Sequence, residues 1–274
     1  MKKRSRFTTI FLILVFVAGL SLLLYPTVSE RWNAVHQSRA IASYSEVVAT
    51  LDDVSYEDVW KRAHAYNREL FQGNGDYFLD EMKLAEYESL LDVTNLGIMG
   101  YIEIPSIACS LPIYHGTDES ILQIAIGHLE WTSLPVGGES THCVLSGHRG
   151  LPSAKLFTNL DKVSEGDIFM LRVLDEILTY EVDQILIVEP DDTEALHITA
   201  GEDLCTLVTC TPYGVNSHRL LVRGHRIETE EAVTSAHVVS DAIQIDPMIV
   251  AGVIAIPLVL ILFIGYMLKP KRRY

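Results

Sequence analysis

The stretch TLVTCTPYGVNSHRLLVRG, residues 206–224, decides the fold of this 274-residue chain. Both of its ends are rich in β-branched and apolar residues, as strands are, and its middle carries the turn residues Pro212 and Gly214. If the two strands pair as an antiparallel hairpin, Cys210 and Arg219 become cross-strand neighbours. A thiol beside a guanidinium is a candidate nucleophile with an anion-stabilising group. A strand-end cysteine is also commonly a small buried hydrophobe, so this stretch alone leaves both interpretations open.

A second motif, VLSGHRG, lies upstream at residues 144–150. A predicted strand ends at Ser146, and His148 follows in a glycine-flanked turn. This geometry exposes an imidazole at a strand tip, and imidazole is the side chain best suited to move protons near neutral pH. A turn histidine without a chemical role is the simpler interpretation, and the motif taken alone favours it.

From about residue 99 onward the chain has the pattern of a β domain. Glycine and proline, as at Gly166 and Pro190, separate short runs of apolar and β-branched residues. Seven or eight short strands separated in this way predict a barrel or a sandwich. The predicted strands are residues 100–104, 111–114, 141–146, 167–173, 178–189, 203–210 and 219–227.

Residues 30–95, in contrast, have helical periodicity. Apolar residues recur near helical spacing from Val47 to Leu70, and the Gly73-Asn74-Gly75 sequence interrupts the pattern. A short helix is predicted over residues 80–91, and its apolar face is formed by Leu84, Tyr87, Leu90 and Leu91.

Two uncharged apolar runs lie near the ends of the chain. Residues 7–25 follow four Lys and Arg residues among the first six positions, and residues 247–268 precede four more among the last six. Each run is long enough to cross a membrane, and the basic flanks predict that both termini are cytoplasmic. A cleaved signal peptide is the alternative for the first run, although no small-residue cleavage site follows it. A buried core helix is the alternative for the second.

Composition and charge exclude several classes of protein. An apolar fraction of 49% excludes disorder for most of the chain. The formal net charge is −15, and no Asp or Glu lies within residues 1–25 or 247–274, so the central part is strongly acidic. A nucleic-acid binder needs a basic face, and nucleic acid is therefore excluded as a partner.

The four cysteines suit an extracellular disulfide framework by count alone, but their spacing weakens that interpretation and predicts no metal site. They are Cys109, Cys143, Cys205 and Cys210, and no Cys-x-x-Cys motif is present. In an extended strand, Cys205 and Cys210 face opposite sides and lie about 16 Å apart, which is too far for a disulfide. Cys143 and Cys205 are expected to be buried.

Several segments together resemble the sortase family. TLVTC at residues 206–210, with Arg219 nine positions after the cysteine, is similar to the sortase signature Thr-Leu-x-Thr-Cys, and the histidine of SGHRG matches the catalytic histidine. GHLEWTSLPVGG, GHRGLPSAKLFTNL and TCTPYGVNSHRLLVRGHRI, which begin at residues 127, 147 and 209, resemble the class C, or pilin-polymerising, sortases of Gram-positive bacteria. The resemblance implies a mainly β fold, an eight-stranded sortase-type barrel with N-terminal helices, flanked by two transmembrane helices.

The resemblance also implies the chemistry. Cys210 is the implied nucleophile, His148 the proton donor and acceptor, and Arg219 the stabiliser of the oxyanion or the substrate. Sortases cleave LPxTG-like sorting signals between Thr and Gly through a cysteine thioester, which an amine then resolves. In class C members the amine is a lysine of the next pilin subunit. The expected partners are therefore pilin or surface-protein sorting signals, a pilin lysine as acyl acceptor, and the membrane, and no cofactor or metal is expected.

Class C sortases carry a lid over the active site, usually Asp-Pro followed by an aromatic residue. This chain has Asp76-Tyr77-Phe78 in the corresponding region and lacks the proline. The resemblance therefore implies that Asp76 and Phe78 form a lid, which covers the active site less firmly because the proline is absent. A surface loop is the alternative. Thr209 is expected either to contact substrate or to pack within its strand. Strand alternation places His218 on the face opposite Arg219, so His218 is interpreted as structural.

Two other functions stay open. One is a housekeeping-type sortase that anchors surface proteins to a peptidoglycan precursor, and the other is a non-catalytic membrane protein that binds sorting signals. The predicted organisation is a cytoplasmic tail (1–6), a transmembrane signal anchor (7–25), an extracellular helical and lid region (26–98), the barrel (99–230), a linker (231–246), a second transmembrane helix (247–268) and a cytoplasmic tail (269–274).

Overall fold

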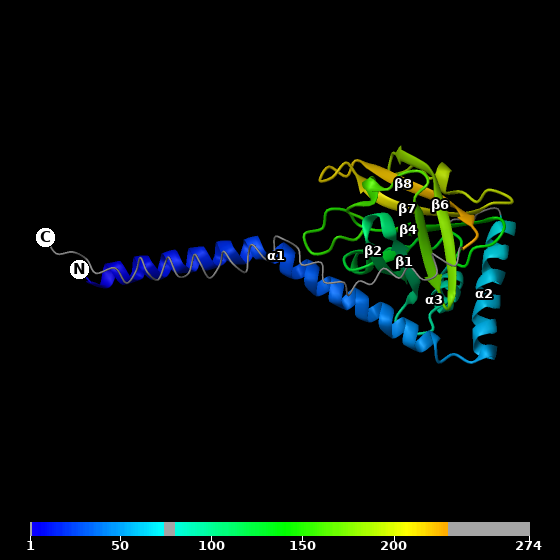
Figure 1. Cartoon of the computed structure of the whole chain (residues 1–274), viewed down its shortest axis with the longest axis horizontal. Helices are drawn as coiled ribbons and strands as arrows, with labels where there is room; N and C mark the ends of the chain where they lie inside the picture. Colours follow the sequence, from blue (N-terminus) through cyan, green and yellow to red (C-terminus); the bar gives the residue numbers. More distant parts are fainter. Residues whose placement is uncertain (1, 74–79, 230–274) are drawn as a thin grey trace. The chain divides into compact units, whose positions relative to one another are not determined.

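The computed structural model describes residues 2–73 and 80–229. Its long helices, at the N-terminal end, are α1 (Lys2–Val48) and α2 (Asp53–Gln72), followed by α3 (Glu81–Ser89), as Figure 1 shows. The side chain of Asp52 accepts a bond from Ser55 N at 2.7 Å, and that of Asp80 accepts one from Lys83 N at 2.8 Å. These caps fix where α2 and α3 begin. The helical region is confirmed, but a break at residues 49–52 divides it, which the periodicity did not predict.

Helix α1 runs without interruption from the N-terminal apolar run into the helical region. The predicted boundary after residue 25 therefore lies inside one helix, with Pro26 in its interior. Most side chains of residues 11–25 are exposed, as Leu22 is at 77%. Among the described residues, this is the one helix long and apolar enough to cross a membrane. The second predicted span, residues 247–268, lies outside the described residues.

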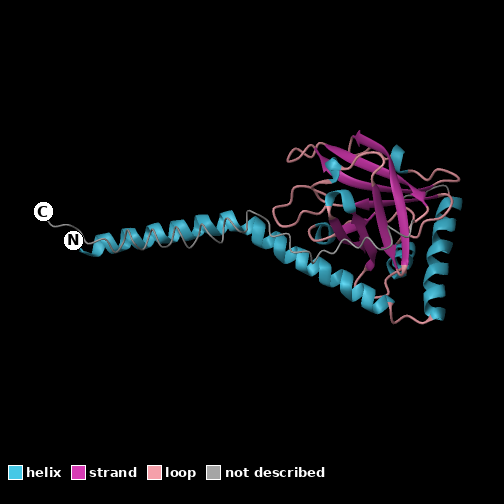
Figure 2. Cartoon of the chain, viewed as in Figure 1, coloured by secondary structure: helices cyan, strands magenta, loops and turns pink. Residues whose placement is uncertain are grey.

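Eight strands form a closed barrel, as the resemblance implied (Figures 1 and 2). Around the barrel the order is β1-β2-β3-β4-β7-β8-β6-β5. The predicted strand ends lie within two residues of the observed ones, but β3 was missed because three residues carry too little alternation. The strands are β1 (Ile98–Ile104), β2 (Cys109–His115), β3 (Ile126–His128), β4 (Thr141–Ser146), β5 (Ile168–Val173), β6 (Glu176–Val188), β7 (Asp203–Thr211) and β8 (His218–Ile227). Short helices connect them: η1 (Pro105–Ile107), α4 (Glu119–Leu122), η2 (Leu160–Lys162) and η3 (Glu194–Leu196).

Strand pairing brings the two sequence motifs to the same end of the barrel. β4 and β7 run parallel, with Ser146 opposite Val208, so their C-terminal ends lie together. β7 and β8 run antiparallel, so β8 begins at that same end. The turn after β4, the end of β7 and the start of β8 therefore meet, although β4 lies far from β7 and β8 in the sequence.

The helices share the hydrophobic core of the barrel. Ala63 and Tyr66 of α2 and Tyr87 of α3 are buried in one cluster with apolar side chains of the strands. The predicted apolar face is confirmed for Leu84 and Tyr87, which lie on α3 and pack in this cluster. Leu90 and Leu91 are buried as well, but α3 ends at Ser89, so they reach the core from the segment after the helix and not through helical spacing.

Helix α1 is attached to the barrel through one buried tyrosine. Tyr44 is 0% exposed, donates its hydroxyl to Met99 O at 3.0 Å and accepts from Leu174 N at 2.7 Å. Burial raises the pKa of Tyr44, so its hydroxyl keeps the proton that it donates. The C-terminal part of α1 is therefore held against β1 and the turn between β5 and β6.

Two loops near the end of β4 are also held by α1. Asn33 Nδ2 donates to Ser153 O at 2.9 Å, and Gln37 Nε2 donates to Ile124 O at 2.7 Å. Ser153 belongs to the segment that follows His148. The helix that carries the N-terminal apolar run is therefore in direct contact with the surroundings of the histidine motif.

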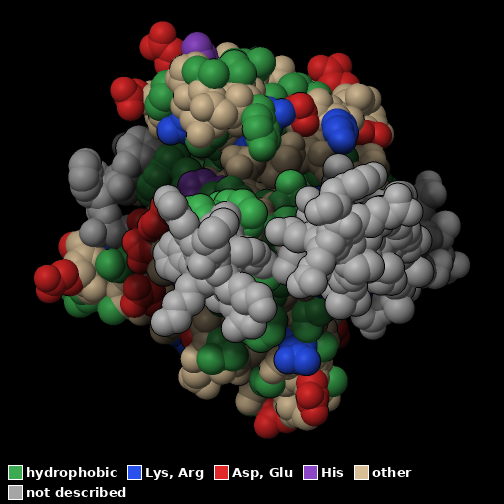
Figure 3. Space-filling view, turned by 90° about the vertical axis from the view of Figure 1, so that its left-hand side faces the viewer, with side chains coloured by type: hydrophobic (Ala, Val, Ile, Leu, Met, Phe, Trp, Pro, Cys, Tyr) green, Lys and Arg blue, Asp and Glu red, His purple; other side chains and the backbone are tan. Residues whose placement is uncertain are grey.

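The acidic surplus lies largely on the surface. Figure 3 shows Asp and Glu side chains spread around the margin of one face. Glu103 of β1, by contrast, is 1% exposed and accepts a bond from Arg172 Nε of β5 at 2.7 Å. Tyr101 and Arg172 are register partners, so Glu103 is the diagonal neighbour of Arg172 on the same face. A buried charge pair therefore joins β1 to β5.

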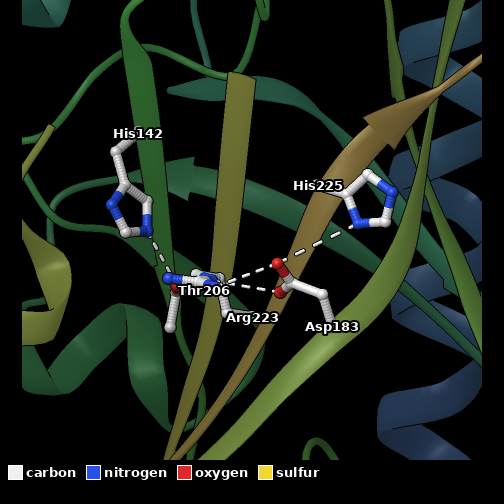
Figure 4. Close-up of polar contacts among 5 residues, drawn as sticks. All are labelled: His142, Asp183, Thr206, Arg223 and His225. Carbon is white, nitrogen blue, oxygen red and sulfur yellow. Dashed lines mark hydrogen bonds and ion pairs between the residues drawn. The ribbon is translucent and has the colours of Figure 1, made fainter. Parts of the chain in front are cut away.

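His142 is buried on β4 and its tautomer is fixed by two hydrogen bonds. Figure 4 shows its ring beside Thr206. Its Nδ1 lies 2.9 Å from His197 O, and a carbonyl only accepts, so Nδ1 carries the proton. Its Nε2 then accepts from Thr206 Oγ1 at 2.7 Å. Burial lowers the pKa of His142, and the nearby Arg223 acts in the same direction, while the His197 carbonyl and Asp183 oppose the shift.

Stability should fall as the pH drops below about 6.5, the ordinary pKa of an unfolded histidine. The pKa of His142 in the folded chain is lower than this value. Between the two pKa values the unfolded chain binds more protons than the folded chain, so a falling pH favours unfolding. Urea unfolding at several pH values measures this slope. The unfolding free energy of His142→Gln should vary less steeply with pH than that of the unaltered chain, by up to about 1.4 kcal/mol per pH unit. His115, whose pKa burial also lowers, keeps part of the slope in that variant. An unchanged slope would contradict the prediction.

Candidate active site

Cys210 lies at the end of β7, directly opposite Arg219 at the start of β8. The expected antiparallel hairpin and its cross-strand neighbours are thus confirmed. The hairpin loop includes Pro212 and Gly214, as the sequence predicted. Cys210 and Arg219 are both half-buried, so each is accessible from solvent while resting on the barrel. Arg219 Nη1 donates to the carbonyl oxygens of Asn216 at 3.4 Å and His218 at 3.2 Å, which hold its guanidinium at the loop.

The turn that carries His148 is attached to the strand that carries Cys210. Gly147 N donates to Val208 O at 3.0 Å, and Thr209 Oγ1 donates to Gly147 O at 2.7 Å. A Cβ at Gly147 would lie 2.5 Å from a side-chain atom of Ile126 and 2.7 Å from one of Phe157, so a larger residue here would force these buried side chains to move. His148 itself is half-buried. Two hydrogen bonds therefore hold the turn that carries His148 against the strand that carries Cys210.

Glu119 is a residue of the site that sequence reasoning missed. It begins α4, and its Oε2 lies 3.6 Å from His148 Nε2. The side-chain amide of Gln123 donates to Glu119 and, together with His148, lowers the pKa of its carboxyl group, so it is charged at neutral pH. A carboxylate at this position attracts His148 whenever the ring is protonated. No local pattern signals the contact, because the two residues belong to different loops.

The other three cysteines are buried, as expected for Cys143 and Cys205. Cys109, Cys143 and Cys205 are 8%, 2% and 0% exposed. Burial raises the pKa of Cys109 to about 12 and that of Cys205 well above its ordinary value. A thiol held in this way is a poor nucleophile. Among the four, Cys210 is the half-exposed thiol.

The remaining sequence-predicted residues separate into three groups. Thr209 is 2% exposed and bonded to Gly147, so its hydroxyl supports the histidine turn. His218 is exposed, with its Nδ1 2.9 Å from Ser217 Oγ. Asp76 and Phe78, the expected lid residues, lie outside the described residues. Within the described part of the chain, no group of three or more His, Cys, Asp and Glu side chains is placed to hold a metal ion.

Comparison with known proteins shows where this arrangement recurs. The chain matches the Sortase domain family over residues 102–227. Sortase C1 from Streptococcus agalactiae is 50% identical with a TM-score of 0.68, and the match covers 70% of this chain and 100% of that one. Streptococcus pneumoniae sortase C is 47% identical with a TM-score of 0.61, over 70% of this chain and 97% of that one. Clostridium perfringens sortase C, solved with the C-terminal cell wall sorting motif, is 45% identical with a TM-score of 0.62, over 70% and 100%.

Curated relatives match over shorter stretches. Sortase D of Bacillus subtilis is 32% identical over 131 residues, which cover 47% of this chain and 63% of that protein. Sortase A of Streptococcus agalactiae is 29% identical over 166 residues, which cover 58% of this chain and 66% of that protein. The chain thus spans less than two thirds of the length of these two relatives.

Proposed function

Because this chain belongs to the sortase family, we propose that it is a membrane-anchored cysteine transpeptidase that acts on LPxTG-like sorting signals. The observation that carries the proposal is the pairing of Cys210 with Arg219, beside the strand whose turn carries His148. In this arrangement the proposed nucleophile, anion stabiliser and proton carrier belong to the same end of the barrel. A non-catalytic sorting-signal binder has no need of this combination.

The reaction follows from the chemistry of these three groups. Cys210 thiolate attacks the Thr carbonyl carbon of the sorting signal, and Arg219 donates to the oxygen that becomes negatively charged. The C–N bond to Gly then breaks, His148 gives its proton to the departing amine, and a thioester remains on Cys210. An incoming amine attacks the thioester carbon and loses a proton to His148. The C–S bond breaks, so a new amide forms and the Cys210 thiolate is restored.

The amine that we propose is a pilin lysine. The support is the similarity of 45 to 50% identity to solved class C sortases, among them the Streptococcus pneumoniae enzyme whose report concerns pilin substrate specificity. A housekeeping role, with a peptidoglycan precursor as the amine, is the alternative. Incubation of the full chain with pilin and with wall precursor separates the two, because linked pilins form a ladder and a wall-linked protein gives a single product.

His148→Ala and Arg219→Ala should each lower the turnover of a sorting-signal peptide by about a hundredfold or more. The first loses the proton carrier and the second a donor to the oxyanion, and each such loss is typically of this size. Steady-state cleavage of a fluorogenic peptide measures the effect, and His218→Ala is the matched control on the neighbouring exposed residue. A variant at either position that keeps more than about a tenth of the turnover would contradict the assigned role.

We also propose a topology in which the barrel is extracellular and both termini are cytoplasmic. Its support is the basic residues beside each apolar run and the exposed apolar helix α1. A fluorescent protein fused after Tyr274 should therefore be bright inside the cell, and a phosphatase fused there should be inactive. An active phosphatase after Tyr274 would exclude the proposed second span.

A further inference from the structure

Arg149, the residue after His148, contacts three separate segments of the chain. Its Nη2 donates to Asp161 Oδ2 at 2.5 Å, and its Nη1 donates to Thr211 Oγ1 at 3.4 Å. Its guanidinium carbon also lies 5.9 Å from the centroid of the Tyr213 ring. The side chain is 9% exposed, so these partners replace most of the water that a free guanidinium would bind.

Two of these contacts reach the strand of the nucleophile. Thr211 follows Cys210 directly and is the last residue of β7. Tyr213 lies in the loop that leads from β7 to β8. A Cβ at Gly150, whose φ is +76°, would lie 2.8 Å from the Tyr213 ring, so the ring also lies close to the histidine turn. The guanidinium and the glycine therefore connect the turn after β4 with the end of β7.

The third contact anchors the same turn on its other side. Asp161 belongs to η2, and the segment before η2 returns to the histidine, since Phe157 N donates to His148 O at 3.1 Å. Gly150 N donates to Thr158 Oγ1 at 3.0 Å in the same segment. Arg149 thus lies between two elements. One is the segment of residues 157–161, which is bonded to the histidine turn, and the other is β7, which carries Cys210.

We propose that Arg149 is a positioning residue that sets the distance and orientation of His148 relative to Cys210. The inference rests on the proposed function, in which these two groups exchange a proton with the substrate. Rates of such steps depend steeply on geometry, because a displacement of about 1 Å can cost about a hundredfold. Arg149 touches neither substrate nor reacting atoms in this assignment, and it acts through the two residues that do.

An arginine is required here by the shape of the guanidinium. Its two Nη atoms donate to different acceptors on Asp161 and Thr211, and its guanidinium carbon lies over the Tyr213 ring. The ammonium group of a lysine is a single point charge. It can pair with the Asp161 carboxylate, but it does not also reach the Thr211 hydroxyl and the Tyr213 ring. Arg149→Lys therefore keeps the charge and removes the connection to β7.

Arg223 of β8 provides a matched control (Figure 4). It also forms an ion pair with an aspartate, since its Nε and Nη2 lie 3.0 and 2.9 Å from the two oxygens of Asp183. It is four residues along β8 from Arg219, about 13 Å at strand rise. Arg223→Lys therefore weakens an arginine–aspartate pair of the same barrel away from the proposed site.

The experiment compares the full chain in detergent micelles with Arg149→Lys, Thr211→Val and Arg223→Lys. Arg149→Lys should lower kcat for a sorting-signal peptide by about ten- to a hundredfold with KM changed less than about twofold. The pH profile of Cys210 alkylation by iodoacetamide should also shift in Arg149→Lys, because the thiol then meets a displaced imidazole. Thr211→Val removes one hydroxyl at nearly constant shape and should move both readouts in the same direction by less. Arg223→Lys should leave both unchanged.

Several outcomes would overturn the inference. One is an alkylation profile and kcat in Arg149→Lys that coincide with those of the unaltered chain. Another is a loss of kcat in Arg223→Lys as large as that in Arg149→Lys. It would show that weakening any arginine–aspartate pair of the barrel lowers the activity. A rise in KM at constant kcat would show that Arg149 serves binding and not positioning. The alkylation profile needs no substrate, so it decides the role of Arg149 even if the unaltered chain forms no thioester, a result that would refute the proposed function itself.

Discussion

Replacing Cys210 with alanine should abolish the thioester between the enzyme and a sorting-signal peptide. No other thiol is placed to form it, because Cys109, Cys143 and Cys205 are buried in the barrel. The rate of peptide cleavage should fall by a factor on the order of 10⁶, which is the scale of losing the nucleophile in a hydrolase. Intact-protein mass spectrometry after incubation with the peptide measures the adduct, and cleavage of a fluorogenic peptide measures the rate.

Cys205→Ala is the matched control for this experiment. Cys205 lies on the same strand, is 0% exposed and has no path to the substrate. Its replacement should leave the adduct intact and the rate within about twofold, because it removes only one buried sulfur atom. An active Cys210→Ala together with a dead Cys205→Ala would show that the nucleophile has been assigned to the wrong end of the strand.

Glu103→Ala should destabilise the barrel by about 3–5 kcal/mol, because it leaves the charge of Arg172 buried without its carboxylate partner. Whole domains are stable by only about 5–15 kcal/mol, so the loss is a large fraction of the total. Urea unfolding followed by circular dichroism measures it. The double variant Glu103→Leu, Arg172→Met removes both charges and should regain much of the loss.

A half-exposed pair provides the comparison for Glu103. Asp183 and Arg223 pair on neighbouring strands, and each side chain is 27% exposed. Asp183→Ala should cost no more than about 1 kcal/mol, since water replaces the lost partner. If Glu103→Ala and Asp183→Ala cost the same, burial does not determine the strength of the pair and the argument for Glu103 fails.

Local patterns predicted most strands and the central hairpin. The turn residues between Cys210 and Arg219 specify a reversal of the chain, and the apolar runs on either side specify strands. Pairing in register then follows, and Cys210 lies opposite Arg219 as expected. The same reasoning missed β3, whose three residues carry no usable alternation, and the break between α1 and α2.

Contacts between distant loops were beyond local reasoning. Glu119 and Arg149 show no periodicity or motif that marks them as partners of His148 or of the end of β7. Their roles follow from the positions of α4 and η2, which depend on how the whole barrel closes. The expected lid residues Asp76 and Phe78 and the second apolar run stay predictions.

The sequence by itself determined a β-rich domain, the apolar N-terminal helix and the hairpin that pairs Cys210 with Arg219. These depend on interactions between near neighbours: hydrogen bonds along a helix, alternation along a strand, and turns at Gly and Pro. The residues proposed to carry the chemistry came from the resemblance to the sortases and not from such local patterns. Only the tertiary structure decided that β4 lies parallel to β7, which brings His148 to the Cys210 end of the barrel. Parallel strands are joined by long connections, so their pairing is set by closure of the whole sheet and not by any local pattern.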